Sequence, residues 1–277
     1  MNPWLLPEPP YWKSLVDLAL SEDCGLGDVT SPCLDPELSV EWYIEAQAGG
    51  VLCGIGIAQY LVGNTNLRVL CKDGDEVKPG TTVIEGSTNA RHLLAVERTA
   101  LNFLMHLSGV STITSHFVAA VQGTRAKIID TRKTLPGLRA LEKYAVRCGG
   151  GHNHRMGLYD GAMIKDNHIK SSGSISEAVR RIRETSSHMI KIEVECESED
   201  QVKEAIEVGT DIVMLDNMSP ESMKLITDRY HKQCLFEASG GITISSVRKV
   251  AESGVDFISV GALTHSAPSL ALHLEVR

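Results

Sequence analysis

Basic residues follow two apolar runs in the middle of the chain, where strand ends are expected. The run at 128–129 leads into DTRKT (130–134), and the run at 162–164 leads into KDNH (165–168). Between them lies a glycine-rich segment, GGGHNHR (149–155). In parallel α/β architectures, ligands bind at the carboxyl ends of the strands. Arg donates in pairs to planar carboxylates and phosphates, and Lys adds a compact charge, so this stretch predicts a pocket for an anion.

The basic stretch contrasts with the composition of the whole chain. The formal net charge is −8 and the pI is about 5.7. A local inversion of sign predicts a pocket for a small anion, whereas binding to nucleic acid would favour a broad basic face. The cations that come directly after a strand or a glycine loop are the candidate binding residues: Arg132, Lys133, Arg155 and Lys165. Arg139, Lys143 and Arg147 lie in a helix-like segment and fit a solvated face equally well.

The composition indicates a globular protein of one large or two smaller domains. The 277 residues are 43% hydrophobic and 22% charged, with only 5% aromatic residues, so the core should consist of Val, Ile, Leu and Ala. No apolar run approaches the roughly 20 residues of a membrane span. We expect no secretory signal in the first 13 residues, which lack a basic leader and a long apolar segment. Seven Cys residues without a CxxC pair favour reduced thiols and a cytoplasmic location.

Apolar runs and helical segments alternate from residue 128 onward. Six runs are visible, at 128–132, 161–165, 190–196, 211–217, 234–240 and 257–261. The segments between them have helical periodicity, and several begin with Ser, a good N-cap. This order predicts right-handed crossovers and a parallel sheet. The later strands begin 21 to 23 residues apart, which favours a closed barrel, although the standard barrel has eight strands.

The residues before 128 indicate mixed α and β structure. Residues 11–21 fit a short amphipathic helix with Leu15, Leu18 and Leu20 as its apolar positions. Residues 40–62 alternate as strands do, and 90–121 repeat Leu at helical spacing. Arg98 interrupts this helical run, and a lone Arg in such a position usually marks an exposed face.

Acidic residues and glycines end the later strands. Glu193 and Glu195 alternate within one run, so both should face the same side, toward the barrel interior or its mouth. The next strands end in polar or small residues: Asp216, Asn217, Ser239, Gly240, Gly241 and Gly261. Glycine lets backbone N–H groups approach an oxyanion closely, which is typical of the phosphate site of barrels. His152 and His154 have no acidic residue or Cys nearby in sequence, so their spacing is a weak signal for zinc.

Several of these segments together resemble the quinolinate phosphoribosyltransferase family over almost the whole chain. The motifs are EDCGLGDVTS (22–31), ERTALNFLMHLSG (97–109), DTRKTLPGLR (130–139), GGGHNHRMGL (149–158), IKDNHI (164–169) and EASGGI (237–242). The resemblance implies an α/β protein with a mixed N-terminal domain (1–112) that covers the partner's active site. It implies an incomplete TIM-like barrel of six parallel strands and seven helices (113–265), and a C-terminal segment (266–277) that returns to the first domain.

The resemblance also implies the reaction and the roles of single residues. Quinolinate and phosphoribosyl pyrophosphate would give nicotinate mononucleotide, pyrophosphate and CO2 with Mg²⁺, a step of de novo NAD biosynthesis. The implied quinolinate site contains Arg132, Thr134, His154, Arg155 and Lys165, with Arg98 supplied by the neighbouring subunit of a homodimer. Lys133, Glu195 and Asp216 are implied as catalytic residues at the second substrate, and Ser239, Gly240, Gly241 and Gly261 as phosphate ligands. Glu195 and Asp216 would hold the metal directly or through water and pyrophosphate, and the dimers could assemble further into a hexamer.

Two alternatives stay open at this stage. A paralogue on the same scaffold could use another base, such as nicotinate, and would then need fewer carboxylate-binding cations. A catalytically idle phosphosugar-binding or assembly protein should have lost Lys133, Glu195 or Asp216, and the chain retains all three.

Overall fold

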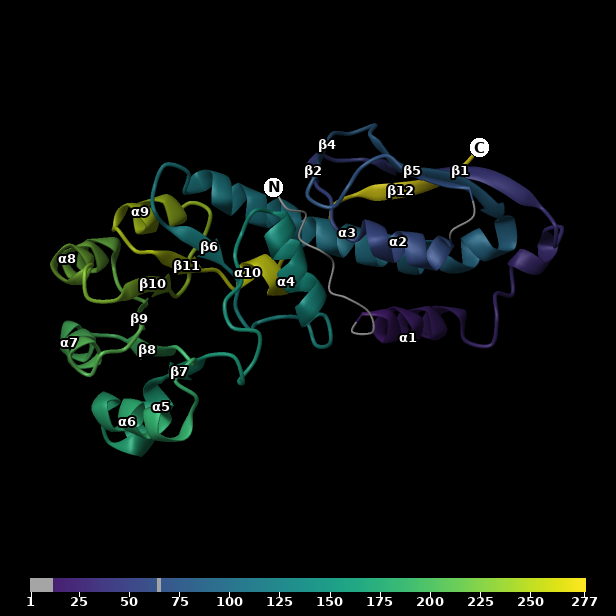
Figure 1. Cartoon of the computed structure of the whole chain (residues 1–277). Coiled ribbons are helices and arrows are strands. Elements are labelled where there is room, and N and C mark those ends of the chain that lie inside the picture. The colour runs from purple at the N-terminus through teal and green to yellow at the C-terminus, as the bar shows by residue number, and fades with distance from the viewer. Residues whose placement is uncertain (1–11, 64–65) are drawn as a thin grey trace. The chain divides into compact units, whose positions relative to one another are not determined.

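The computed structural model of the protein describes residues 12–63 and 66–277 (Figure 1). The expectation of no secretory signal concerns mainly residues 1–11, which lie outside the described residues. The chain forms two compact units. One comprises 1–115, 134–150 and 262–277, and the other comprises 116–133 and 151–261. The domain boundaries expected at 112 and 265 stay a prediction, because compact units need not coincide with domains.

The first unit contains a four-stranded antiparallel sheet in the order β12-β1-β5-β3. Its strands are β1 (Ser39–Ala46), β3 (Leu67–Val69), β5 (Thr82–Asn89) and β12 (Leu272–Val276), while β2 (Gly50–Val51) and β4 (Glu76–Val77) pair separately. Its helices are α1 (Lys13–Cys24), η1 (Ser31–Cys33), α2 (Ile55–Val62), most of α3 (Ala90–Ala120), α4 (Arg139–Cys148) and α10 (Ala262–His265). The last strand, β12, joins the sheet by pairing with β1.

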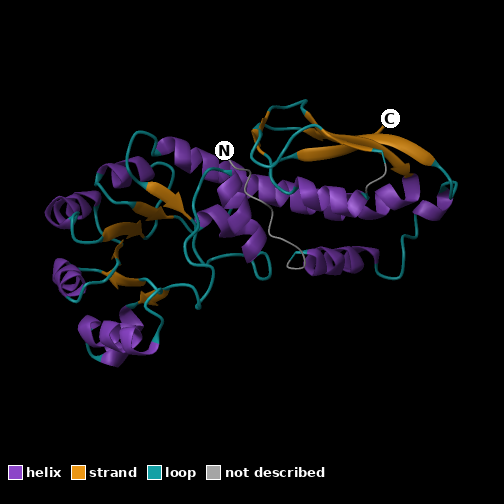
Figure 2. Cartoon of the chain, in the orientation of Figure 1, coloured by secondary structure: helices purple, strands orange, loops and turns teal. Residues whose placement is uncertain are grey.

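An apolar face of the antiparallel sheet packs against helices. Helices α2 and α3 run along one side of the sheet (Figures 1 and 2). Trp42 and Ile44, two residues apart on β1, are buried, and so are Leu93 and Leu104 of α3. Residues two apart on a strand share a face, so this burial follows from the alternation of β1. The expected helix is present as α1, but the prediction that Leu18 belongs to its apolar face was wrong, because Leu18 is 66% exposed whereas Val16 is buried.

The second unit contains six parallel strands in the order β6-β11-β10-β9-β8-β7. They are β6 (Lys127–Ile129), β7 (Ala162–Ile164), β8 (Ile192–Cys196), β9 (Ile212–Asp216), β10 (Leu235–Ser239) and β11 (Phe257–Ser259). The helices between them are α5 (Asp166–Ser172), α6 (Ile175–Thr185), α7 (Glu199–Glu207), α8 (Pro220–Tyr230) and α9 (Val247–Glu252). Each predicted run overlaps one observed strand, so the parallel, six-stranded fold class is confirmed. Seven α-helices, α4 to α10, follow β6 along the chain.

The sheet stays open between β6 and β7, which corrects the closed barrel that the strand spacing favoured. The outer edge of β6 is occupied by His152, which forms a parallel bridge with Ile129. His152 N donates to Ile128 O at 2.8 Å, and Asp130 N donates to His152 O at 3.2 Å. The glycine-rich loop therefore takes the hydrogen bonds on β6 that a closing strand would use.

Capping residues set the starts of three helices in this unit. The side chains of Ser174, Ser198 and Ser219 accept hydrogen bonds from backbone N–H groups at the starts of α6, α7 and α8. These caps confirm the helix starts that the Ser residues predicted. None of the described helices combines the length and apolar composition that a bilayer span requires.

Candidate active site

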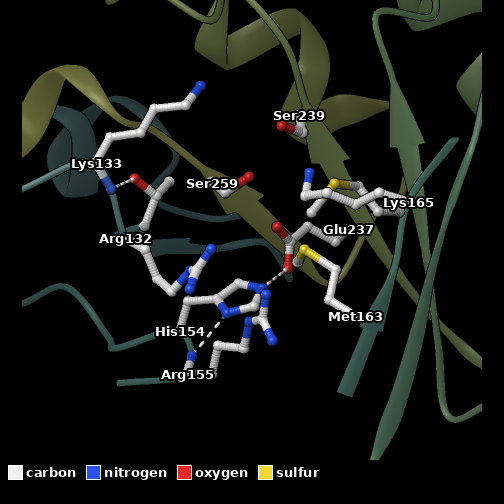
Figure 3. A pocket seen from close by; sticks show the side chains of 11 residues that line it. Arg132, Lys133, His154, Arg155, Met163, Lys165, Glu237, Ser239 and Ser259 are labelled. Carbon is white, nitrogen blue, oxygen red and sulfur yellow. Dashed lines mark hydrogen bonds and ion pairs between the residues drawn. The ribbon is translucent and has the colours of Figure 1, made fainter. Parts of the chain in front are cut away.

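A cavity of about 150 Å³ lies within the six-stranded unit (Figure 3). It is lined by Thr131, Arg132, Lys133, His154, Arg155, Met163, Lys165, Met214, Glu237, Ser239 and Ser259. The strands alternate, so that Val213 and Phe236 are buried on one face while Met214, Glu237 and Ser239 face the cavity. The structure thus brings six of the predicted binding residues to one cavity: Arg132, Lys133, His154, Arg155, Lys165 and Ser239.

Asp130 holds the loop that carries His154 and Arg155. Its side chain is fully buried. Its carboxylate accepts from Asn153 Nδ2 at 2.5 Å and from His154 N at 2.9 Å. A buried carboxylate with charge-assisted hydrogen bonds is a strong anchor, so the loop bearing Arg155 is fixed to the end of β6.

The two guanidinium groups of the cavity repel each other. Burial lowers the pKa of Arg155, and the charge of Arg132 lowers it further. Arg155 Nη1 donates to Gly161 O at 2.9 Å, which orients the planar fork. Two like charges around a small cavity create a strongly positive potential, and a bound dianion would relieve their repulsion.

His154 stands between two buried carboxylates. Its Nε2 lies 2.9 Å from Glu193 Oε2 and 3.6 Å from Glu237 Oε2. The backbone N of Arg155 donates to His154 Nδ1 at 2.6 Å. Nδ1 therefore accepts, and the ring proton belongs on Nε2, where it is donated to Glu193. Neither Glu193 nor Glu237 was predicted as a site residue, although the alternation of Glu193 with Glu195 was a signal for the first.

Lys165 links the cavity to the neighbouring strand end. It caps the start of α5, where its N–H donates to His168 Nδ1 at 3.0 Å. Its Nζ forms an ion pair with Glu195 Oε2. Glu195 is half-buried at the end of β8, so a cation and an anion are held together at the rim rather than deep inside.

The ends of β9 and β10 form a turn region rich in positive φ angles. Gly240 and Gly241 have φ values of 100° and 58°, and Asn217 has 54°. A Cβ on Gly240 would lie 2.2 Å from Asn217 Oδ1, so only glycine fits there. Asp216 pairs in register with Ser239, which brings the predicted acidic and phosphate-binding residues together.

The remaining predicted residues lie outside this cavity. Glu195, Asp216, Gly240, Gly241 and Gly261 belong to the same unit but do not line the cavity. Arg98 is exposed on α3, and Thr134 accepts from Arg139 Nε at 3.1 Å, both in the first unit.

Two clusters in the described residues bring metal-ligating atoms within 4.8 Å of one another. One is His154 with Glu193 and Glu237, where the Nε2 proton already bridges to Glu193. The other, in the first unit, contains Cys53, Asp73 and Cys148. Asp73 accepts from the backbone N–H groups that begin α2 and from Tyr144, and burial raises the pKa of the Cys53 thiol. In these clusters hydrogen bonds engage His154, Glu193 Oε2 and Asp73, whereas Glu193 Oε1 and Glu237 Oε1 are buried without a hydrogen-bond partner among the described residues.

The sequence matches two domain families in succession. Residues 28–108 match "Quinolinate phosphoribosyl transferase, N-terminal domain", and residues 110–275 match the C-terminal domain of the same name. The chain belongs to the quinolinate phosphoribosyltransferase family. The chain is therefore an enzyme of this phosphoribosyltransferase family, and the resemblance seen in the motifs is confirmed.

Relatives across bacteria share the whole length. The chain is 44% identical over 268 residues to a probable nicotinate-nucleotide pyrophosphorylase [carboxylating] of Bacillus subtilis. This match covers 95% of this chain and 93% of that protein. It is 39% identical to the enzyme of that name from Mycobacterium leprae, with 95% and 96% covered. The solved structure of NadC from Streptococcus pyogenes matches with a TM-score of 0.93 at 37% identity, covering 98% of each chain. The nicotinate-nucleotide pyrophosphorylase of Francisella tularensis matches with a TM-score of 0.92 at 36% identity, over 100% of each chain.

Proposed function

We propose that this family member transfers the phosphoribosyl group of phosphoribosyl pyrophosphate to quinolinate and decarboxylates the product. The products are nicotinate mononucleotide, pyrophosphate and CO2, a step of de novo NAD biosynthesis. One observation carries the proposal: Arg132, Arg155 and Lys165 converge on a single cavity of about 150 Å³. The positive charge that these three side chains bring to one cavity suits the two adjacent carboxylates of quinolinate better than a single carboxylate.

The pyridine dicarboxylate would lie over the floor formed by Met163 and Met214, which line the same cavity. Arg155 would present its fork to one carboxylate, since its other side is fixed by Gly161 O. His154 and Thr134 are proposed beside it, and Arg98 is proposed to come from a second subunit.

The second substrate would bind along the strand ends next to this cavity. Lys133 lines the cavity and is exposed, so it can meet the pyrophosphate oxygens as a mobile point charge. Ser239 with Gly240, Gly241 and Gly261 would hold the 5-phosphate through backbone N–H groups.

The carboxylates at the strand ends fit a magnesium ion. Glu195 and Asp216 are half-buried oxygen donors at the ends of the paired strands β8 and β9, and Mg²⁺ prefers such ligands together with water and phosphate oxygens. When bound, magnesium would neutralise the leaving pyrophosphate. Asp216 accepts from Asn217 Nδ2 at 2.7 Å, which orients its carboxylate.

The residues of the chain would act mainly through position and charge. Lys133 would stabilise the charge that develops on pyrophosphate, and Glu195 and Asp216 would stabilise the positive charge that develops on the ribose. The cations of the cavity would hold the ring nitrogen toward the anomeric carbon. No side chain needs to form a covalent intermediate.

We further propose a cytoplasmic homodimer, able to assemble as a trimer of dimers, in which each N-terminal domain (1–112) covers the partner's barrel (113–265). Arg98 supports this proposal, because it is exposed on α3 rather than packed in its own unit. An isologous dimer would repeat the composite site twice.

The test is a product balance with purified protein. Quinolinate, phosphoribosyl pyrophosphate and Mg²⁺ should yield mononucleotide, pyrophosphate and CO2 in equal amounts. Release of pyrophosphate without CO2 would contradict the proposal and favour a base other than quinolinate.

A further inference from the structure

Glu237 is a buried carboxyl group inside a cavity that is otherwise cationic. It lies on β10, is 1% exposed, and lines the cavity together with Arg132, Arg155 and Lys165 (Figure 3). Its Oε1 is buried and makes no hydrogen bond with any of the described residues. Its Oε2 lies 3.6 Å from His154 Nε2. A buried oxygen without a partner in a ligand cavity calls for a chemical explanation.

The surroundings of Glu237 favour its neutral form. Burial raises its pKa well above the ordinary value, and the neighbouring Glu193 carboxylate adds to this shift, while the Ser259 hydroxyl and the charge of Lys165 oppose it. His154 does not stabilise an ionised Glu237 by a hydrogen bond, because its Nδ1 accepts from Arg155 N and its Nε2 proton is donated to Glu193. These surroundings favour the carboxylic acid form of Glu237, which lines the cavity.

The proposed reaction needs one proton at carbon 2 of the pyridine ring. When the bond from carbon 2 to its carboxylate breaks, CO2 leaves and the electron pair stays on carbon 2, next to the quaternised nitrogen. The product carries hydrogen there. Neither substrate supplies that proton, so the protein or water must do so.

We propose that Glu237 is the general acid that protonates carbon 2 after CO2 departs, an assignment that rests on the proposed function. The O–H bond of Glu237 breaks, its proton forms the new C–H bond, and Glu237 is left as a carboxylate. Water restores the proton when the product leaves and solvent enters the cavity. No oxidant, reductant or further reactant is required.

Electrostatics favour this donor. Departure of neutral CO2 removes one carboxylate from the cations Arg132, Arg155 and Lys165. The newly ionised Glu237 replaces it, so the number of carboxylates facing these cations is unchanged. The neutral acid also avoids repelling quinolinate before the reaction, whereas an ionised Glu237 would oppose binding of a dianion.

The other groups that line the cavity are poorer donors. Lys165 is engaged with Glu195, and arginine does not release its proton in proteins. The hydroxyl groups of Thr131, Ser239 and Ser259 are too weakly acidic to serve as general acids near neutral pH. The Nε2 proton of His154 is donated to Glu193, and Lys133 is assigned to pyrophosphate in the proposed reaction. Water is then the remaining alternative donor, and the isotope experiment below distinguishes it from Glu237.

The test measures the hydrogen isotope at carbon 2 of the mononucleotide formed in an equal mixture of H2O and D2O. The ratio of H to D, read by NMR, reports the group that delivers the proton. Glu237→Gln keeps the shape of the side chain and removes the acid. We expect it to slow product formation about 10²-fold or more and to give a different H/D ratio, because water becomes the donor. Glu237→Asp should retain the wild-type ratio at a reduced rate. Glu184→Gln is the matched control, because it removes an acid that is 58% exposed on α6, and it should also retain the wild-type ratio.

A Glu237→Gln protein that forms product with the wild-type H/D ratio would overturn the proposal, even if its rate falls. If Glu237→Gln forms no product although it is folded and binds quinolinate, recovery of product formation in Glu237→Asp supports the proposal, and equal inactivity of both variants overturns it. Failure of the proposed function is distinguishable, because the wild-type protein itself would then form no mononucleotide with hydrogen at carbon 2.

Discussion

Replacing Arg155 by Ala should weaken quinolinate binding without affecting the second substrate. Arg155 lines the cavity, and Gly161 O already fixes one end of its guanidinium group at 2.9 Å. The fork is therefore oriented before the ligand arrives, and little side-chain entropy is lost on binding. A hydrogen bond to a charged group contributes roughly 1.5–3 kcal/mol. The dissociation constant for quinolinate should rise by about 10- to 150-fold.

The assay is calorimetric titration of each substrate, with thermal unfolding as a check on folding. Loss of the bond to Gly161 O should cost roughly 1.5–3 kcal/mol of stability at most, partly offset because the repulsion between Arg155 and Arg132 is removed. Arg155→Lys keeps the charge but not the fork, so its affinity should fall between those of wild type and Arg155→Ala. Arg180→Ala is the matched control, because Arg180 is 53% exposed and pairs with Glu177 and Glu184 on the surface of α6. Equal loss of affinity for both substrates, or an equal effect in Arg180→Ala, would refute the assigned role.

Three further predictions concern the dimer, the metal and the buried acid. Mixing Arg98→Ala with Lys133→Ala should restore activity to roughly a quarter of wild type, since about half of randomly reassorted dimers carry one intact site; no recovery after proven subunit exchange would place Arg98 in its own subunit's site. Asp216→Asn should raise the magnesium concentration needed for half-maximal activity while leaving quinolinate affinity within about twofold, because one charged ligand is lost; an unchanged magnesium requirement would remove Asp216 from the metal site. The raised pKa of Glu237 means that the folded state binds its proton more tightly than the unfolded state. The contribution of protonated Glu237 to the free energy of unfolding is therefore fully present below about pH 4.3, and it is lost as pH rises toward the folded pKa. Thermal unfolding across this range should show that Glu237→Gln lacks this decline and is more stable than wild type at neutral pH; parallel curves would contradict the buried acid.

The strands were predictable because their signals are local. The runs 190–196 and 211–217 contain β8 and β9 with at most two extra residues at either end. Each run is apolar on the face toward the helices and ends in polar residues, a pattern that needs no knowledge of distant contacts. The cations of the cavity were predictable for the same reason, since they directly follow strands or the glycine loop.

The two carboxylates beside His154 were not predictable in this way. His154 meets Glu193 across 39 residues of sequence, and Glu237 comes from yet another strand. Glu193 and Glu237 look like ordinary polar positions in buried strands. Only the strand order, with β8 and β10 on either side of β9, together with the loop that carries His154 brings them to one imidazole. The opening of the sheet was also missed from strand spacing, because the edge of β6 is taken by a single residue, His152, which has no strand pattern of its own. At the start of α1, Trp12 and Val16 lie four residues apart and are buried. The leucines of this helix are more numerous, but they do not mark its buried face.

The central claim is that this cavity is built for a pyridine dicarboxylate, and a comparison of two bases tests it most directly. Wild-type protein with phosphoribosyl pyrophosphate and Mg²⁺ is supplied with either quinolinate or nicotinate, and the release of pyrophosphate and CO2 is followed. We predict release of both products with quinolinate and no turnover with nicotinate, because the monoacid brings only one of the two carboxylates whose charge matches the cations Arg132, Arg155 and Lys165. Equal turnover of the two bases would contradict the account.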